Sequence, residues 1–277
     1  MSVSDSVLSC AEAVRTADFD RYLSVLFARR DKRAALFAIY AFNYEVAKTA
    51  EMVSESTLGL IRLQWWRETI AGIFEGTLRR HKVVLSLSNA INSFNLPRIL
   101  FDGLIDAREQ DLTPMPFLVL DDFENYADAS SGNLMRLAAR ILGAGNEFDK
   151  CVRPLGIAYA LTGQLRAMPY HSALRRLMLP MDEVTKAGLC EEDIYAGRTD
   201  NIRILMDSMI GVIKGQLVNT IKKIPRGALP AFLPAALIHP YLKIMTRAKF
   251  NIYSDPVELS VPCKQLTMMS AVLRGRL

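Results

Sequence analysis

Apolar residues along this chain recur at spacings of three and four, which is the pattern of amphipathic helices. Alternating runs of β-branched residues and hairpin dipeptides, which would predict strands, are nearly absent. The pattern therefore predicts an all-α chain of roughly eight to ten helices. The expected helices cover residues 31–53, 57–75, 97–111, 121–142, 147–167, 182–196, 201–223, 229–249 and 262–274.

Local signals set the expected ends of these helices. Asp31 and Thr57 are expected to cap the first two, because their side chains accept hydrogen bonds from the free N–H groups at a helix start. The Gly-Ala-Gly sequence at 143–145 is expected to close the helix before it, and Pro169 to stop the next one. No repeat, low-complexity linker or shift in composition divides the chain, so we expect a single domain over residues 1–277.

The composition adds a large apolar content and a weak positive charge. Hydrophobic residues make up 51% of the chain, which allows a large core either with an apolar cavity or without one. The net charge of +5 is spread along the sequence, which carries no RNA-binding or zinc-finger signature. Nucleic acid is therefore not an expected partner.

Cysteine spacing and hydropathy indicate where in the cell the protein is expected. The four cysteines, at positions 10, 151, 190 and 263, are far apart, which predicts no zinc site and fits a reducing compartment. We expect no secretory signal, and no transmembrane helix because no stretch reaches about 18 uninterrupted apolar residues. Residues 228–245 come closest, but three prolines interrupt them, so they are a candidate for lying on a membrane surface. The expected location is the bacterial cytoplasm, with peripheral contact to the inner membrane.

Several longer stretches share their order and spacing with one protein family. They are "DKRAALFAIYAF", "RLQWWRETI", "ENYADASSGNLMRLAARILG" and "LTGQLRAMPYHSALRRLMLPMDEV". Over about residues 18–255 the chain resembles the squalene/phytoene synthase family. The resemblance implies an isoprenoid-synthase-type helical bundle around a central apolar cavity. It also implies an activity that joins two prenyl diphosphates head to head with magnesium.

The family binds its magnesium through two D-x-x-x-D motifs on facing helices. Residues four apart lie on one face of a helix, so a pair of carboxylates there can hold a hard divalent cation. At the positions of the first motif this chain has Ala47 and Glu51, with Lys48 beside Ala47. One carboxylate remains in that motif.

The second motif, which reads L-T-N-x-L-R-D-x-x-x-D in the family, has lost both aspartates. The asparagine position is Gly163, the aspartate positions are Ala167 and His171, and Arg166 is kept. Across both motifs only Glu51 could be an anionic ligand. We therefore predict no catalytic residue, no metal ligand and no cofactor, and expect Mg²⁺ only if the chain is an enzyme after all.

Other positions of the family pattern are kept. They are candidate contacts to a diphosphate or to the cavity, because guanidinium groups can bind a diphosphate without a metal. The alternative is that the arginines form surface ion pairs and that Trp65 and Trp66 pack between helices. The candidates are Arg62, Arg67, Tyr126 and Arg166.

Two further features are expected to be structural. Pro169, Tyr170 and His171 are expected to close the former cavity mouth, with His171 hydrogen-bonded to a helix end rather than to a metal. Asp102 and Asp106 form another D-x-x-x-D, but outside the family's metal helices. We expect them on a solvated helix face.

The substitutions themselves resemble one branch of the family. The run "LRAMPYH" and the stretch "AFNYEVAKTAEMVSESTLGLIRLQWWRETI" are similar to an aspartate-less branch that includes a mitochondrial protein required for assembly of respiratory complex I. The resemblance implies a non-catalytic protein that acts in this assembly, with a respiratory-chain assembly partner, or that binds an isoprenoid diphosphate or lipid. The alternative is an active prenyltransferase using farnesyl or geranylgeranyl diphosphate. Glu45 and Glu51 clustered with a further acid would favour the enzyme, whereas Lys48 pointing inward would oppose it.

Overall fold

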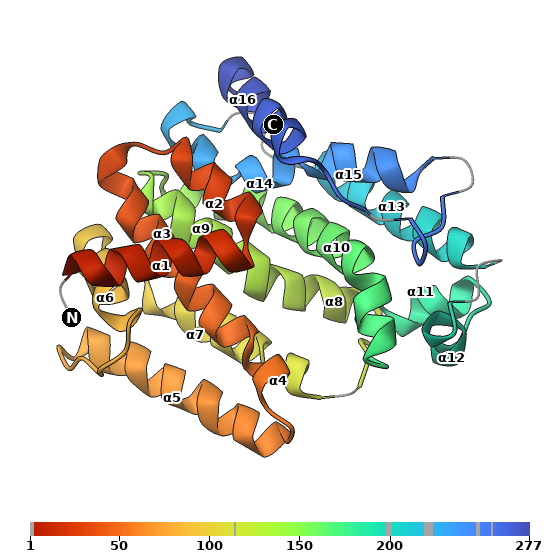
Figure 1. The fold of residues 1–277 in the computed structure, drawn as a ribbon, viewed down its shortest axis with the longest axis horizontal. Coiled ribbons are helices and arrows are strands. Elements are labelled where there is room, and N and C mark those ends of the chain that lie inside the picture. Colours follow the sequence, from red (N-terminus) through yellow and green to blue (C-terminus); the bar gives the residue numbers. More distant parts are fainter. Residues whose placement is uncertain (1–2, 114, 198–200, 219–223, 248–249, 256) are drawn as a thin grey trace.

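The structure is a computed structural model that describes residues 3–113, 115–197, 201–218, 224–247, 250–255 and 257–277. These residues form helices joined by short connections, and none of them is in a β-strand, which confirms the predicted all-α class (Figure 1). The helices are α1 (Val3–Ala17), α2 (Phe19–Leu26), α3 (Arg30–Ala47), α4 (Thr49–Met52), α5 (Ser56–Phe74), α6 (Val84–Phe94), α7 (Arg98–Ala107), α8 (Leu120–Ala127), α9 (Asn133–Ile141), α10 (Asp149–Ala173), α11 (Met181–Lys186), α12 (Glu191–Tyr195), α13 (Ile202–Val218), α14 (Leu233–Ala236), α15 (Ile238–Met245) and α16 (Val261–Arg274).

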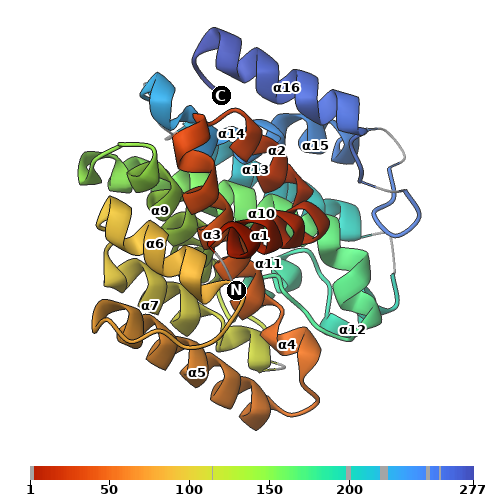
Figure 2. The ribbon, with the colours of Figure 1, turned by 60° about the vertical axis from the view of Figure 1, so that its left-hand side comes forward.

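Helices α3 and α10 lie in the interior of the bundle, as Figures 1 and 2 show from two sides. Every residue from Ala35 to Phe42 is buried, and a helix that is apolar on all sides belongs in a core. Helix α3 packs against α1, α6 and α9, whereas α10 packs against α13, α8 and α15. The ring of Phe42 meets those of Trp66 and Phe101 edge to face, at centroid distances of 5.3 and 5.5 Å.

The helix predicted over residues 31–53 is divided at Lys48. Helix α3 ends at Ala47 and α4 follows from Thr49. Asp31 does not cap α3, because the residue before the helix is Arg29 and Asp31 lies inside the first turn. Thr57 likewise lies inside α5, which follows Glu55. Both cap predictions are wrong by two residues.

Helix α10 continues past the proline that was expected to end it. It runs for 25 residues and contains both Pro154 and Pro169. A proline in a helix interior costs about 3 kcal/mol, because one hydrogen bond is lost and the ring crowds the preceding turn. Leu165 and Met168 on the same stretch are buried, and each buried side chain of this kind returns roughly 1.5–3 kcal/mol. Tertiary burial therefore outweighs the local signal.

Other predicted helices are interrupted, and three were not predicted. The range 182–196 forms α11 and α12, and 229–249 forms a 3₁₀ segment (Arg226–Ala231), α14 and α15. Helices α1, α2 and α6 lie outside every predicted range, so the described residues hold more helical segments than expected. The ends of two predicted helices, 219–223 and 248–249, lie outside the described residues.

A single π-helical turn, Asp128–Gly132, joins α8 to α9 within the predicted range 121–142. Such turns are rare and often occur at functional sites. A Cβ on Gly156 of α10 would lie only 2.8 Å from the Cα of Gly132, so the backbones of the π-turn and α10 are in direct contact. This contact fixes the π-turn against the middle of α10.

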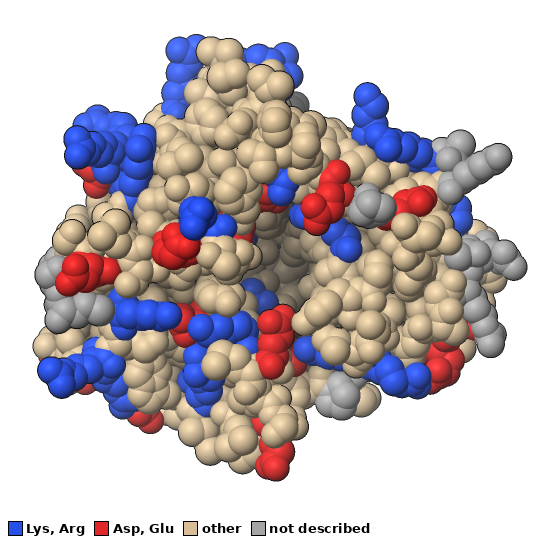
Figure 3. Space-filling model, in the orientation of Figure 1, with Lys and Arg blue, Asp and Glu red and all other residues tan. Residues whose placement is uncertain are grey.

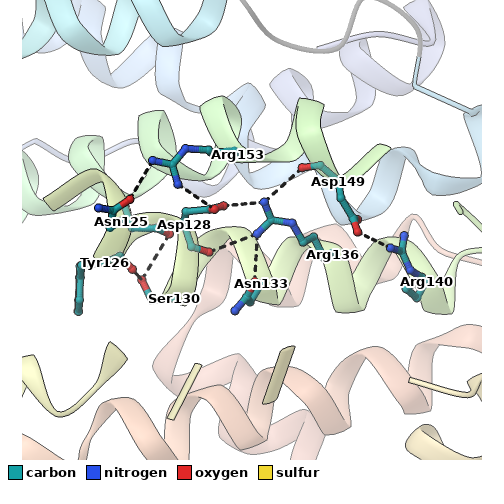
Figure 4. A network of polar contacts seen from close by, with 10 residues as sticks. Asn125, Tyr126, Asp128, Ser130, Asn133, Arg136, Arg140, Asp149 and Arg153 are labelled. Atoms are coloured by element: carbon teal, nitrogen blue, oxygen red, sulfur yellow. Dashed lines mark hydrogen bonds and ion pairs between the residues drawn. The ribbon is translucent and has the colours of Figure 1, made fainter. Parts of the chain in front are cut away.

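The outer side of the π-turn carries a network of charged side chains (Figure 4). Asp128 accepts from Arg136 at 2.7 Å through one carboxylate oxygen and from Arg153 at 3.0 Å through the other. Arg136 also donates to Asn133 at 3.0 Å, and Arg140 pairs with Asp149 at 2.7 Å. Helices α9 and α10 are thereby tied together by matched charges.

The candidate membrane-surface segment, residues 228–245, belongs to the core. Leu229, Phe232, Leu233 and Leu237 are each at most 2% exposed. The proposal that this segment lies on a membrane is therefore wrong, because its apolar side chains cover α2, α9, α10 and α16. None of the described helices combines the length and the apolar character needed to cross a membrane.

Candidate functional site: a cavity walled by arginine

A cavity of about 210 Å³ lies among α3, α8, α10 and α15. Three arginines line it, Arg21, Arg108 and Arg166, and among the described residues no Asp or Glu does. We call it the arginine cavity. Figure 3 shows a hollow near the middle of the molecule in this orientation, with basic and acidic side chains around its rim.

Arg108, which follows α7, is fixed by two partners. Its Nη1 donates to Asp111 at 3.1 Å and to the hydroxyl oxygen of Tyr126 at 2.8 Å. The Tyr126 hydroxyl donates in turn to Asp111 at 2.8 Å, and burial raises the pKa of that phenol above its usual range. The Nε of Arg108 is buried and has no hydrogen-bond partner in the described structure. Tyr126, a predicted cavity contact, lies on the wall beside Arg108.

Arg166 of α10 lies over an aromatic ring. Its guanidinium carbon is 3.8 Å from the ring centroid of Tyr241 on α15, and its Nε donates to the carbonyl oxygen of Val257 at 3.4 Å. Its Nη1 is 3.8 Å from Asp20, beyond hydrogen-bond reach, and Asp20 already pairs with Lys264 at 2.6 Å. The outer N–H groups of Arg166 are thus only weakly engaged.

Arg21 of α2 is held deeper in the wall. It pairs with Asp18 and lies over two rings, with its guanidinium carbon 5.0 Å from the centroid of Tyr159 and 5.7 Å from that of Tyr40. Burial raises the pKa of Tyr40 to about 12, so this phenol is neutral beside the cation. Cation–π contacts of this kind stabilise a partly desolvated guanidinium.

The second motif forms one face of α10 and lines the arginine cavity. Gly163, Ala167 and His171 all border it, at the i, i+4 and i+8 positions of the helix. A Cβ at Gly163 would meet no other atom within 4 Å, so this position is open space. Gln164 also borders the cavity, and its buried Oε1 has no partner in the described structure.

His171 lies in the cavity wall as a neutral imidazole. Burial lowers its pKa to about 4, and the nearby Arg176 adds to this effect while Asp111 opposes it. The buried Nδ1 of His171 makes no hydrogen bond to a helix end, since it has no partner among the described residues. Pro169, Tyr170 and His171 remain within α10, and the side chain of Tyr170 is exposed.

The first motif lies outside the arginine cavity. Asn43, one turn before Ala47, is the residue of α3 that lines it. Lys48 turns to Glu45 and donates to its Oε1 at 2.7 Å, while Arg62 donates to Oε2 at 3.0 Å. Neither of the two arrangements that would have separated the enzyme from the alternative is present: Lys48 does not border the cavity, and Glu45 does not cluster with other acids there.

Glu51, the one carboxylate left in the motifs, is exposed on α4. Because it does not border the arginine cavity, it lies apart from the groups that line the second motif.

Two of the predicted arginine contacts, Arg62 and Arg67, also lie elsewhere. Arg62 borders a separate depression beside Trp65 and His81. Arg67 bridges Asp106, at 2.7 Å, and Glu109 on the outside of α7. The structure therefore brings together Tyr126, Arg166, Gly163, Ala167 and His171, but leaves Arg62 and Arg67 outside.

The two aspartates of the further D-x-x-x-D lie on the outer side of α7. Asp102 pairs with Arg98 at 3.1 Å and Asp106 with Arg67, as expected for a solvated helix face.

The groups in the arginine cavity do not suit magnesium. Mg²⁺ binds through oxygen ligands, mostly carboxylates and water, and guanidinium groups repel it. The described residues contain no cluster of three or more His, Cys, Asp or Glu side chains able to hold a metal ion. A metal site of the D-x-x-x-D kind therefore has no counterpart in this part of the chain.

The lining residues that were not predicted from the sequence include Gln164, Arg21 and Arg108. Gln164 stands inside the second motif, directly after Gly163 and two positions before Arg166, so its place in the motif was a usable signal. Arg21 and Arg108 gave none, because their partners Tyr159 and Tyr126 are distant from them in the sequence.

Comparisons with known proteins place this architecture among its relatives. The profile of the squalene/phytoene synthase family matches residues 14–264. A bovine protein named NADH dehydrogenase (ubiquinone) complex I, assembly factor 6 is 31% identical over 254 residues, which cover 90% of this chain and 76% of the relative. The chloroplastic phytoene synthase 2 of Solanum lycopersicum is 26% identical over 279 residues, covering 96% and 88%.

A solved dehydrosqualene synthase has the same fold. Its TM-score is 0.87 at 15% sequence identity, with 98% of this chain and 96% of the other covered. The structural likeness confirms the isoprenoid-synthase-type bundle that the motifs predicted. Together with the match over residues 14–264, it leads to one conclusion: the chain belongs to the squalene/phytoene synthase family.

Proposed function

We propose that this chain is a non-catalytic member of its family that acts in the assembly of respiratory complex I. The observation that carries the proposal is the arginine cavity, which has three guanidinium groups and no carboxylate in its described walls. The relative named as a complex I assembly factor supports the assembly role, since it aligns with 90% of this chain.

The chemistry of prenyl transfer explains why the missing carboxylates matter. Loss of diphosphate from a prenyl substrate leaves concentrated negative charge, which bound metal ions neutralise as it develops. A magnesium cluster needs several oxygen ligands, and the second-motif positions supply Gly163, Ala167 and His171 instead. The enzyme alternative retains support from family membership and from the arginines, which could bind a departing diphosphate.

A turnover assay tests the absence of catalysis. Purified full-length protein is incubated with farnesyl or geranylgeranyl diphosphate and Mg²⁺ or Mn²⁺, and released diphosphate is measured against a metal-free sample. A synthase of known activity serves as the positive control. We expect no metal-dependent release, and a clear release would establish the enzyme alternative.

Deletion of the gene in the organism that encodes it tests the assembly role. We expect less assembled complex I on native gels and slower NADH oxidation by membranes, with unchanged isoprenoid products. Wild-type chain supplied on a plasmid should restore both. Normal complex I together with a missing prenyl product would contradict the proposal.

A further inference from the structure

We propose that α2 and α16 form a face that binds the surface of an anionic lipid bilayer. Apolar side chains of α16 enter the acyl region, and arginines near the ends of the two helices lie among the lipid headgroups. The face is distinct from the buried segment 228–245, against which α16 packs. The inference goes beyond the proposed function, because it concerns where the protein is held and involves neither turnover nor the arginine cavity.

A groove of about 450 Å³ lies between the end of α2 and the outer side of α16. Among the described residues that line it, only Gln265 is polar. The apolar residues in its walls are Leu23, Leu26, Phe27, Pro262, Leu266 and Met269. Leu273 continues the same side of α16, because it lies four residues after Met269. We call this groove, together with the outer side of α16, the apolar face.

Helix α16 is apolar on two sides, and only one of them is covered. Met268 and Ala271 are 0% exposed on the side that packs against α14 and α2. Leu266, Met269 and Leu273 are 60%, 45% and 77% exposed on the other side. A helix on the surface of a globular protein ordinarily carries polar side chains on its outer side. A contiguous apolar surface in that place marks an interaction site.

The charge of the same two segments favours an anionic partner. Residues 26–33, which end α2 and begin α3, carry four cations and one acid, so their net charge is +3. Residues 261–277 carry three cations and no acid, so their net charge is also +3. Together these two short segments exceed the net charge of the whole chain, which is +5. The positive charge of the protein is therefore concentrated around the apolar face, where it attracts anions.

Four arginines of these segments are exposed. They are Arg29 and Arg30 at the junction of α2 and α3, and Arg274 and Arg276 at the end of α16. Arg29 pairs with Asp31 only at the surface, with 83% of its side chain exposed, so a lipid phosphate can replace this partner. Lys264 is not available, because its ammonium group pairs with Asp20 at 2.6 Å. Basic side chains flank the projecting α16 at the top of Figure 3.

A bilayer suits this arrangement better than a protein does. A second copy of the chain would bring the same positive charge against itself, which opposes association. Protein interfaces are usually centred on buried Trp, Tyr or Arg side chains, whereas the exposed stripe consists of Leu and Met. A helix that lies on a membrane needs an apolar side with cations beside it. Figures 1 and 2 show α16 along the outside of the molecule, where its whole length can meet a surface.

Sedimentation with lipid vesicles tests the proposal. Purified full-length protein is mixed with vesicles of phosphatidylglycerol and phosphatidylcholine in equal amounts, and separately with vesicles of phosphatidylcholine alone. We expect at least about tenfold more bound protein with the anionic vesicles, because each basic side chain near an anionic surface adds to the attraction. Raising the salt concentration should release the protein, since exposed charges are screened.

An apolar variant shows whether the apolar face is responsible. Leu266→Gln with Met269→Gln removes two exposed apolar side chains and should reduce binding to anionic vesicles at least about tenfold. Leu60→Gln with Ile61→Gln on α5 is the matched control, because those side chains are 45% and 62% exposed. The control should bind as the wild type does. Circular dichroism and thermal unfolding establish that both variants are folded.

A charge variant tests the arginines separately. Arg274→Gln with Arg276→Gln should weaken binding to anionic vesicles several-fold and reduce its dependence on salt. Arg175→Gln with Arg203→Gln removes an equal charge from surface ion pairs outside α2 and α16, and should leave binding unchanged.

The outcomes separate the bilayer from other occupants. No binding to anionic vesicles would overturn the proposal, and so would equal binding to both kinds of vesicle. A dimer in solution that Leu266→Gln with Met269→Gln dissociates, measured by light scattering, would assign the face to a second copy and overturn it as well. None of these measurements involves a prenyl diphosphate or complex I. Failure of this inference therefore leaves the proposed function untouched, and the turnover assay leaves this inference untouched.

Discussion

Two groups of arginines lie near the π-turn Asp128–Gly132, and they differ in their hydrogen-bonding partners. On the outer side, Arg136 and Arg153 share the carboxylate of Asp128 at 2.7 and 3.0 Å (Figure 4). On the cavity side, Arg108 retains a buried Nε without a partner in the described structure, and Arg166 comes no nearer to Asp20 than 3.8 Å.

The same residue type thus has two roles, which its surroundings determine. In the outer network each cation has an oxygen at hydrogen-bond distance, so its charge is used to join helices. In the cavity the aromatic rings, with Asp18 beside Arg21 and Asp111 beside Arg108, stabilise the cations without occupying all their donors. Four predictions test this contrast, from the largest expected effect to the smallest.

Removing the shared carboxylate should cause the largest loss of stability. In Asp128→Ala, Arg136 is left buried without its main counter-charge, which typically costs about 3–5 kcal/mol of unfolding free energy. Urea denaturation followed by circular dichroism measures it. Asp207→Ala, which removes an exposed i,i+4 partner of Arg203, is the control and should cost less than about 0.5 kcal/mol. Equal effects in the two variants would show that the outer network is not structural.

Adding one methyl group between the π-turn and α10 should disturb both arginine groups together. In Gly156→Ala the new Cβ would lie 2.8 Å from the Cα of Gly132, so the backbones must separate. Overpacking of this kind costs about 1–3 kcal/mol. Thermal unfolding measures the loss, with Gly163→Ala as the control because a Cβ at Gly163 meets nothing within 4 Å. A Gly156→Ala variant as stable as Gly163→Ala would contradict the close contact.

Lowering the pH should reduce the free energy of unfolding, and the group responsible should be His171 in the cavity wall rather than the outer network around Asp128. The pKa of His171 is about 4 in the folded chain, below the ordinary value of 6.5, because of burial and Arg176. Between these values the unfolded chain binds a proton that the folded chain does not, so stability falls as the pH drops from about 6.5 toward 4. By pH 5 we expect a loss of about 2 kcal/mol from this group.

Urea unfolding at pH 7.5 and pH 5 measures this loss, and His171→Gln should remove most of it. His81, whose pKa burial also lowers, contributes in the same direction, so His81→Gln is the matched comparison. An unchanged pH dependence in His171→Gln would mean that the ring is not held neutral in the wall.

Restoring two aspartates should produce no turnover at all. In the double variant Ala47→Asp, Ala167→Asp, position 47 does not border the cavity, and Gly163 and His171 still depart from the family pattern. Released diphosphate with Mg²⁺ is the measurement, and magnesium-dependent turnover would show that the cavity is closer to a synthase than the arginines indicate.

Some of the site could be predicted because it lies within one helix. Gly163, Arg166, Ala167 and His171 follow one another at helical spacing, so the sequence placed them on a common face, and the structure has them on one wall. The prediction for Arg62 and Arg67 depended on how α5 is oriented against α7, which sequence spacing does not describe. Ion pairs with Glu45 and Asp106 turn both side chains away from the cavity.

The sequence by itself determined the all-α class, the family and the loss of the aspartates, because helix periodicity and motif spacing are local properties of the chain. Only the tertiary structure decided what took the place of those aspartates. Arg21, Arg108 and Arg166 come from α2, from the end of α7 and from α10, and only packing around the π-turn brings them to one cavity. It also decided that α10 continues through Pro169, since burial of its neighbours offsets the cost of a proline.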